Sequence, residues 1–179
     1  LHREDRMLVP VSINVSRLHA YDEKMAETLI RLREEYDVPP EYVPLELTES
    51  AFLEDEAGMY RRMESLRERG FLVSMDDFGT GYSTMNMLKN QTLDEIKIDR
   101  EFIQDLEKDK SRIIIRNTIV MLQQLGVHIV IEGVETQEQK NFLLGCGCAD
   151  VQGFLFYRPM PVEEFDRLLL AQEQGSHSA

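Results

Sequence analysis

Short apolar runs rich in Val and Ile alternate with longer amphipathic stretches along this chain of 179 residues. The short runs predict strands, and the stretches with apolar residues at helical spacing predict helices. The predicted strands are residues 9–15, 43–48, 71–76, 94–98, 127–131 and 149–154. The predicted helices are residues 22–36, 56–69, 84–89, 100–125 with a break near Asp109, 137–145 and 162–172.

Proline and glycine support these boundaries. Pro39 and Pro40 follow the first predicted helix, Gly70 and Gly126 follow two others, and Pro161 precedes the last. Both residue types commonly mark helix ends. Strands that strictly alternate with helices predict parallel pairing with right-handed crossovers, which leaves an open doubly wound sheet or a (β/α) barrel.

Polar residues near the strand ends favour the barrel. An open sheet binds ligands at one switch point, whereas a barrel uses the C-terminal ends of many strands. Here nearly every apolar run ends near a polar residue, namely Asn14, Glu46, Asp76 with Asp77, Lys97, Glu132 and Gln152. We therefore predict an α/β fold, a (β/α)₈ barrel with six of its eight units in this chain. Residues 1–172 form one domain in this interpretation, and residues 173–179 form a disordered tail.

Charge narrows the range of ligands. The chain has 20 basic and 33 acidic residues, a formal net charge of −13 that disfavours a nucleic-acid groove. An anionic ligand would need a metal ion to bridge it to the carboxylates. The two cysteines, Cys146 and Cys148, are one residue apart, which predicts reduced thiols. No membrane span or signal peptide is evident, so we expect a cytoplasmic domain, whatever anchor the parent protein carries.

The adjacent carboxylates of Asp76 and Asp77 are the strongest indication of chemistry. Consecutive residues of a regular strand point to opposite faces, so both can reach one site only if the strand ends and the backbone turns. Gly79 and Gly81 permit such a turn.

Together with Asn14, Glu46 and Glu132, these two residues would provide an all-oxygen ligand set. Such a set suits Mg²⁺ or Mn²⁺ better than zinc, and the number of carboxylates is consistent with a two-metal site. A two-metal site activates water for in-line phosphoryl displacement.

Three further residues each have a functional and a structural interpretation. Lys97 can orient the water or neutralise charge in the transition state, although a lone lysine at a strand end more often extends to solvent. Glu132 lies in a run of Val and Ile, and a buried acid must be paired, protonated or metal-bound. Glu49 can anchor a neighbouring loop. The four histidines share no pattern, so no catalytic histidine is predicted.

Six motifs in register strongly resemble the EAL-domain family of bacterial cyclic di-GMP phosphodiesterases, from about Val9 to Leu170. They are Asn-Val-Ser at 14–16, Glu-Leu-Thr-Glu at 46–49, Asp-Asp-Phe-Gly-Thr-Gly-Tyr-Ser at 76–83, Ile-Lys-Ile-Asp at 96–99, Glu-Gly-Val-Glu-Thr at 132–136 and Gln-Gly-Phe at 152–154. The resemblance implies a modified (β/α)₈ barrel that hydrolyses cyclic di-GMP to linear pGpG with two Mg²⁺ or Mn²⁺ ions.

The resemblance also implies a role for each matching residue. The metal ligands would be Asn14, Glu46, Asp76 and Asp77, with Glu132 as a further ligand or a base. Lys97 would contact the catalytic water, and Glu49 would hold the loop after Asp77, a segment linked to dimerisation in the family. Gln152 and Pro159 would lie on the substrate side.

The chain departs from the family in lacking the Glu-Ala-Leu signature, which supplies a metal ligand. Because the other motifs are intact, we interpret this as N-terminal truncation. Strands 9–15 and 149–154 would then have free edges, which predicts a homodimer. The alternatives are a non-catalytic cyclic di-GMP receptor and a dimerisation module. Upstream sensory or GGDEF domains are expected in the parent protein, and membrane contact by this domain is not.

Overall fold

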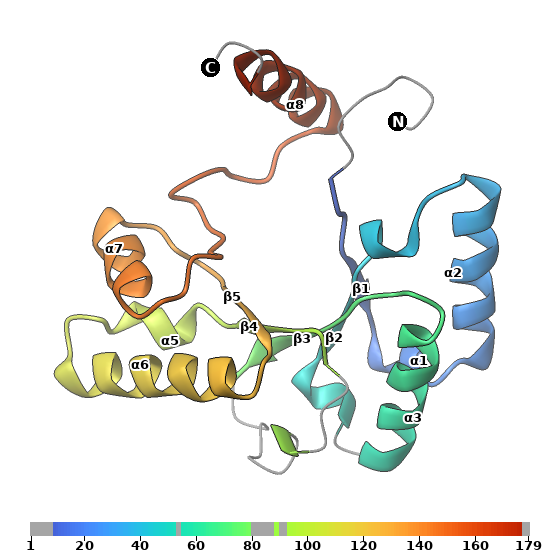
Figure 1. Cartoon of the computed structure of the whole chain (residues 1–179), viewed down its shortest axis with the longest axis horizontal. Helices are drawn as coiled ribbons and strands as arrows, with labels where there is room; N and C mark the ends of the chain where they lie inside the picture. Colours follow the sequence, from blue (N-terminus) through green and yellow to red (C-terminus); the bar gives the residue numbers. More distant parts are fainter. Residues whose placement is uncertain (1–8, 53–54, 80–87, 90–92, 177–179) are drawn as a thin grey trace.

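The computed structural model describes residues 9–52, 55–79, 88–89 and 93–176 (Figure 1), and the following statements concern these residues. One parallel sheet contains five strands, which are β1 (Ile13–Val15), β2 (Leu45–Thr48), β3 (Val73–Phe78), β4 (Glu95–Ile98) and β5 (His128–Ile131). Their spatial order is their order in the sequence. A doubly wound sheet would reverse this order at its switch point, so the strand order is that of a barrel segment.

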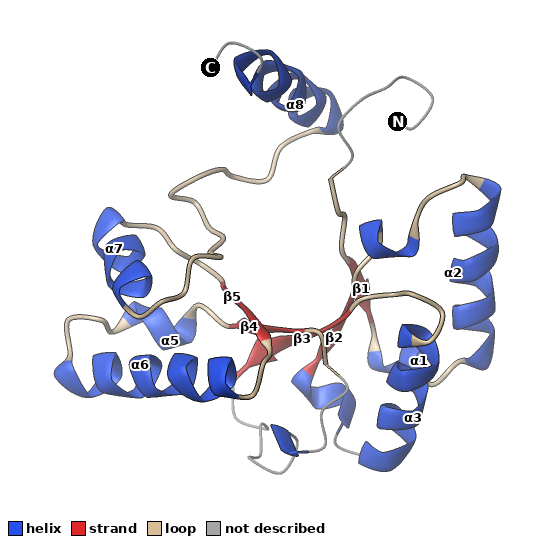
Figure 2. Cartoon of the chain, in the orientation of Figure 1, coloured by secondary structure: helices blue, strands red, loops and turns tan. Residues whose placement is uncertain are grey.

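The helices lie outside the curved sheet (Figures 1 and 2). The α-helices are α1 (Arg17–Ala20), α2 (Glu23–Glu35), α3 (Glu56–Arg67), α5 (Glu101–Gln104), α6 (Asp109–Gln124), α7 (Gln137–Gly145) and α8 (Val162–Ser176). Two short 3₁₀ helices, η2 (Pro40–Tyr42) and η3 (Glu49–Phe52), flank β2. Local sequence explains several helix starts: Asp22 caps α2, Asp55 caps α3, and Thr136 with Gln139 forms a capping box on α7.

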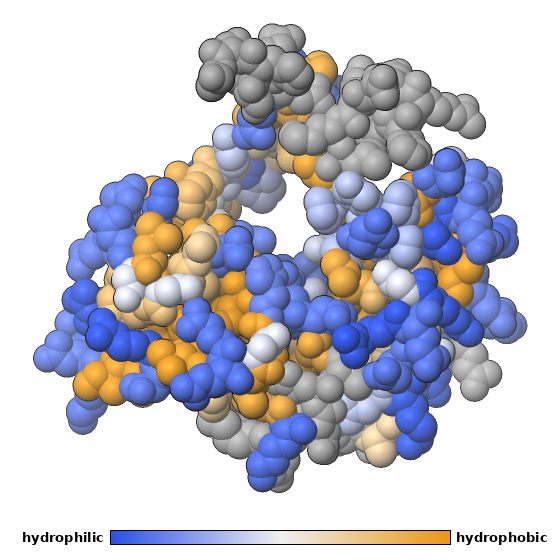
Figure 3. All heavy atoms as spheres, viewed as in Figure 1, coloured by the Kyte–Doolittle hydropathy of each residue, from blue (hydrophilic) through white to orange (hydrophobic). Residues whose placement is uncertain are grey.

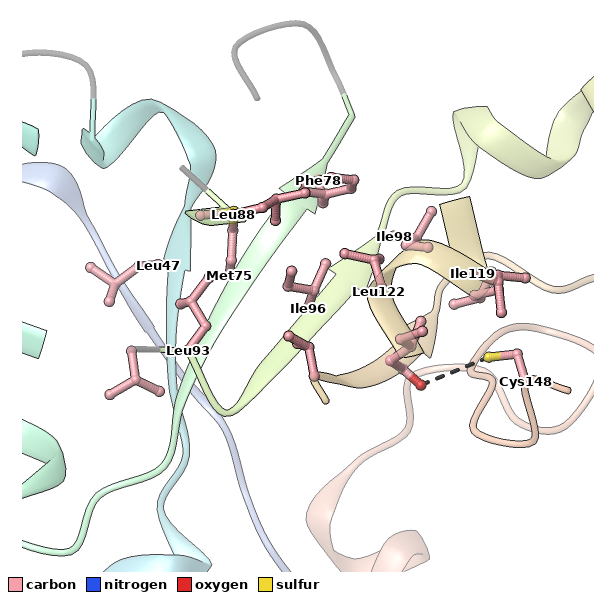
Figure 4. Close-up of a cluster of buried hydrophobic side chains, with 14 of the residues drawn as sticks. Leu47, Met75, Phe78, Leu88, Leu93, Ile96, Ile98, Ile119, Leu122 and Cys148 are labelled. Carbon is pink, nitrogen blue, oxygen red and sulfur yellow. Dashed lines mark hydrogen bonds between the residues drawn. The ribbon is translucent and has the colours of Figure 1, made fainter. Parts of the chain in front are cut away.

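The sheet has one apolar face and one polar face. Alternate residues of the central strands are buried in the core, and Figure 4 shows Ile96 and Ile98 on the side of Ile119 and Leu122 of α6, with Met75 on the side of Leu88 and Leu93. Each such buried side chain stabilises the fold by roughly 1.5–3 kcal/mol. The residues between them face the concave side of the sheet. Figure 3 shows a hollow on this side of the molecule, with α7 on one side of it and α2 on the other.

An irregularity in β3 places both adjacent aspartates on the polar face. Met75 pairs with Ile96 and Phe78 pairs with Ile98, so β3 has one residue more than β4 between these positions. Met75 and Phe78 are both buried in the core although three positions separate them. Asp77 absorbs the extra residue with a left-handed φ of 57°. The strand therefore continues past Asp76, where the sequence predicted its end, and a bulge provides the turn.

Five of the six predicted strands are confirmed, with starts one to four residues later than predicted, and the sixth is wrong. Residues 149–154 form only an isolated bridge between Val151 and Ile131. The regular ladder is interrupted because the register shifts by one residue at Gly133, which has a φ of 69°: the next bonds run from the Val134 N–H to the Gln152 carbonyl and from the Leu155 N–H to the Val134 carbonyl, both at 3.0 Å. The chain then turns, with the Phe156 N–H donating to the Gly153 carbonyl at 3.1 Å.

The predicted helices agree with the structure in most respects. The break in the 100–125 helix is confirmed, since α5 ends at Gln104 and α6 begins at Asp109. The last helix extends to Ser176, so residues 173–176 of the predicted tail are helical and residues 177–179 lie outside the described residues. Residues 84–87 of the predicted 84–89 helix also lie outside them, while residues 88–89 are helical.

Candidate active site at the C-terminal ends of the strands

Lys97 lies at the centre of the polar face and binds two carboxylates. Its Nζ is 2.9 Å from Oε1 of Glu46 on β2 and 2.6 Å from Oε1 of Glu132, the residue after β5. The Lys97 side chain is only 9% exposed, so it does not extend to solvent. Burial by itself would lower the pKa of Lys97, but the hydrogen bonds that its ammonium donates to Glu132 and Glu46, and the negative charges of these residues, raise it. Lys97 is therefore a permanent cation.

The Asp76 carboxylate is influenced by the charges of Glu132 and Lys97, and Lys97 compensates its negative charge only in part. Burial, followed by the charge of Glu132, raises the pKa of Asp76 to about 6, although Lys97 and a backbone hydrogen bond partly oppose this. That bond comes from the Asp77 N–H, which donates to Asp76 Oδ1 at 3.0 Å. Four carboxylates, those of Glu46, Asp76, Asp77 and Glu132, thus stand at this edge of the sheet with one buried ammonium group.

Asn14 lies one strand away from Glu46, because the two residues pair in register across β1 and β2. The predicted ligands therefore come to the same edge of the sheet. In the described part of the chain, no three acidic, His or Cys side chains form a group that could hold a metal ion. Lys97 instead bridges Glu46 and Glu132.

The residues present fit a divalent cation by their chemistry. Every predicted ligand offers oxygen, the donor that Mg²⁺ and Mn²⁺ prefer. Burial and the charge of Glu132 raise the pKa of Asp76 in spite of Lys97, so the further positive charge of a bound cation would favour the ionised carboxylate.

Gln152 and Pro159 lie beside this site. Gln152 Nε2 donates to Glu132 Oε1 at 3.2 Å, which connects the segment after α7 to the Lys97 cluster. Both residues line a pocket of about 520 Å³ between this segment and α8. Its walls are mainly aromatic and aliphatic side chains, such as Phe154 and Phe156. The cationic side chain of Arg158 also lines the pocket.

Glu49 is buried behind the site, at the start of η3. Its side chain is almost fully enclosed, and Oε2 accepts a hydrogen bond from the Gly79 N–H at 3.2 Å. Within the described residues, its Oε1 has no hydrogen-bond partner. Gly79 has a φ of 98°, and an added Cβ would lie 1.8 Å from the Phe102 ring. Glu49 thus holds the first residue of the loop that the sequence assigned to it; residues 80–83 of that loop lie outside the described residues.

The sequence interpretation missed a second polar cluster at the N-terminal ends of the strands. Ser74 Oγ donates to Glu95 Oε1 at 2.9 Å, and the ring of His128 lies between Glu95 and Asp150. The sequence does contain an indication of this cluster. Each of its members Ser74, Glu95 and Asp150 precedes a candidate site residue by two positions, which is the spacing of residues on one face of a strand. Nearby, Arg67 contacts both carboxylate oxygens of Asp94 at 3.1 and 3.2 Å.

The family model of the EAL domain matches residues 1–159. The chain belongs to the EAL-domain family. Among curated relatives of this EAL domain, the cyclic di-GMP phosphodiesterase RocR of Pseudomonas aeruginosa is 35% identical over 158 residues. That match covers 88% of this chain and 40% of RocR. The signaling protein YkoW of Bacillus subtilis is also 35% identical, over 90% of this chain and 20% of YkoW. This EAL domain thus spans well under half the length of these relatives.

A solved structure agrees with the fold of this EAL domain. The PaMucR phosphodiesterase in its c-di-GMP complex has a TM-score of 0.81 and 36% identity, over 87% of this chain and 64% of that one. No helix in the described part of this EAL domain is both long and apolar enough to cross a membrane.

Proposed function

We propose that this chain is the larger part of a phosphodiesterase domain that hydrolyses cyclic di-GMP to linear pGpG with Mg²⁺ or Mn²⁺. The observation that carries the proposal is the buried Lys97 bound to Glu46 and Glu132, with Asp76 desolvated beside it. Membership of the EAL-domain family and the likeness to RocR, named a cyclic di-GMP phosphodiesterase, support the same reaction.

The metal ions would be held by the oxygen ligands Asn14, Glu46, Asp76, Asp77 and Glu132. When bound, such ions would lower the pKa of a water and stabilise the negative charge that develops on the reacting oxygens. The Klebsiella pneumoniae BlrP1 protein, solved as a manganese and cyclic di-GMP complex, supports this choice, with 30% identity and a TM-score of 0.78 over 84% of this chain and 39% of that one.

The chain's own side chains would supply charge, hydrogen bonds and a proton acceptor for the reaction. Lys97 keeps its proton because two carboxylates surround it, so it contributes positive charge and hydrogen bonds to the attacking water or the phosphoryl oxygens and does not act as a base. Glu132 can accept a proton, and Gln152 fixes one of its oxygens by a hydrogen bond. Asp77 reaches the site only because of the bulge in β3.

The pocket beside Gln152 and Pro159 suits the substrate's bases. It measures about 520 Å³ and offers aromatic faces, on which a purine can stack. The Arg158 guanidinium lies 4.3 Å from the centre of the Phe154 ring, so a cation is also held at this rim. A positive group at the rim offsets part of the repulsion between a dianionic ligand and an acidic chain.

The decisive experiment measures pGpG formation by a polypeptide extended upstream to the full length of an EAL domain. We expect turnover with Mg²⁺ or Mn²⁺, its loss in chelator, and a drop of at least about a hundredfold in Lys97→Met, the range for removal of one transition-state hydrogen-bond donor. His19→Gln is the matched control, because His19 lies on α1 and, in the described part of the chain, its ring hydrogen-bonds to Ser16.

Absence of pGpG under all these conditions would refute the proposal. If cyclic di-GMP still bound tightly in chelator without hydrolysis, a receptor function would replace the enzymatic one. Ultracentrifugation of the chain tests the accompanying proposal of a homodimer, which rests on the position of β1 at the edge of the sheet within the described residues, and a monomer at high concentration would contradict it.

A further inference from the structure

His128 lies at the start of β5 and contacts a carboxylate through each ring nitrogen. Nδ1 is 2.9 Å from Glu95 Oε2, and Nε2 is 2.9 Å from Asp150 Oδ2. An ionised carboxylate can only accept hydrogen bonds, so both ring nitrogens must carry a proton to satisfy this geometry. A neutral imidazole has one N–H and would turn a lone pair toward one of the two carboxylates. The arrangement therefore selects the imidazolium form of His128.

The charges around His128 also favour the imidazolium. The hydrogen bond to Asp150 is the main cause that raises the pKa of His128, desolvation opposes it, and Glu95 adds to the increase. The remaining Glu95 oxygen is occupied by the Ser74 hydroxyl at 2.9 Å. The pKa of His128 is therefore raised above its ordinary value of about 6.5.

Other titratable groups near the ring do not compete for its charge. Asp94 precedes Glu95, and its carboxylate is occupied by Arg67 at 3.0 Å and by the Val73 N–H at 2.9 Å. Burial raises the pKa of the Cys148 thiol to about 11, so Cys148 stays neutral throughout the range in which His128 titrates.

Asp150, which His128 contacts, is the first residue of a short segment that ends at Gln152, beside the candidate active site. Asp150 and Gln152 flank the isolated bridge at Val151. Three backbone bonds attach the segment: the Ile131 N–H donates to the Asp150 carbonyl at 3.1 Å, the Gln152 N–H to the Ile131 carbonyl at 2.9 Å, and the Val134 N–H to the Gln152 carbonyl at 3.0 Å. The side chain of Gln152 then donates to Glu132. Because these three backbone bonds are the described ones that hold residues 150–152, the side-chain contact at Asp150 adds a further tie at the start of the segment that carries Gln152.

We propose that His128 is a positioning residue, which as an imidazolium ties residues 150–152 to β4 and β5 and so holds Gln152 against Glu132. Loss of its proton loosens this tie, so the order of the segment depends on pH over the range in which His128 titrates. The consequence for catalysis rests on the proposed function, whereas the tie itself does not.

Amide hydrogen exchange on the metal-free chain tests the proposal. The Gln152 amide reports on the segment, and the Glu132 amide, which donates to the Ile98 carbonyl at 3.0 Å across β4 and β5, is the internal reference. Protection factors are corrected for intrinsic exchange rates, and the His128 ring is titrated by NMR in the same samples. We expect Gln152 protection to fall about 1.5-fold to fivefold as pH rises through the His128 titration, the range for loss of partly exposed ion pairs, with Glu132 unchanged.

Two substitutions separate charge from other effects. His128→Arg keeps a cation with donors at every pH, so Gln152 should stay protected, whereas His128→Gln should be weakly protected at every pH. His19→Gln, in the other described histidine, should behave like the parent chain.

Three outcomes would overturn the proposal: Gln152 protection that does not follow the His128 titration, an equal loss at Glu132, or an unchanged pH dependence in His128→Arg. Neither substrate nor metal enters this measurement. Failure of the extended protein to hydrolyse cyclic di-GMP would therefore leave the result unaffected.

Discussion

The two ends of the strands differ in how their charges are balanced. At the N-terminal ends, Asp94 is paired with Arg67, and the carboxylates of Glu95 and Asp150 share the His128 ring. At the C-terminal ends, four carboxylates stand with the single buried ammonium of Lys97, and the pKa of Asp76 is raised to about 6. The non-glycine residue with positive φ in this sheet, Asp77, is also at the C-terminal end.

This difference separates stability from function within one sheet. Balanced pairs hold strands together at little cost, while an excess of desolvated carboxylate and a strained residue persist only where the rest of the fold maintains them. In barrels of this class, chemistry occurs at the C-terminal face and the N-terminal face serves stability. The charge imbalance therefore identifies the reactive end without reference to any ligand.

The largest expected effect follows removal of the Lys97 charge. Lys97→Met leaves Glu46 and Glu132 facing each other without a cation, which we expect to lower the free energy of unfolding by about 3–5 kcal/mol. Urea denaturation measures it. The double variant Lys97→Met with Glu46→Gln should recover part of the loss, since it removes one unpaired charge. Lys110→Met, an exposed lysine on α6, is the control, and an equal loss there would remove the contrast.

Asp76 gives a pH-dependent effect. Its pKa is raised in the folded state, so the folded chain binds a proton more tightly than the unfolded chain, and stability rises as pH falls through about 6 toward the ordinary value of 3.8. Relative to Asp76→Asn, the parent chain should gain on the order of 1–2 kcal/mol over this range, after allowance for solvent screening.

Denaturation of both chains at a series of pH values checks the Asp76 prediction. If the difference in the free energy of unfolding between the parent chain and Asp76→Asn stayed constant with pH, Asp76 would be an ordinary surface acid. Asp37→Asn serves as the control, because Asp37 is also left-handed, with a φ of 53°, but lies in the loop after α2.

The smallest expected effect lies at the N-terminal end. Arg67→Met removes the partner of Asp94 and should lower the free energy of unfolding by about 1 kcal/mol. The effect is small because both side chains are partly exposed. Affinity for Mn²⁺, measured by calorimetry, should stay the same. Arg69→Met, two positions further on and exposed, should cost less. A large change in Mn²⁺ affinity in Arg67→Met would mean that the two ends are not independent.

The alternation of apolar runs with amphipathic stretches was enough to predict the parallel α/β architecture and the polar edge. Hydrophobic period and strand-end position are local properties, so Glu46, Lys97 and Glu132 could be selected before any coordinates were known. The sixth strand was wrong because Val151 has the right local pattern, but the register shifts by one residue at Gly133, which has a positive φ, and the regular ladder is interrupted there.

By itself, the sequence determined which residues carry chemistry and that they alternate with the core along each strand, since both depend on neighbours in the chain. Only the tertiary structure decided that Asp77 joins Asp76 on one face, that Lys97 is buried between two acids, and that His128 clamps Asp150. Each of these depends on the register between strands far apart in the sequence, and a shift of one position would turn the side chains to the opposite face.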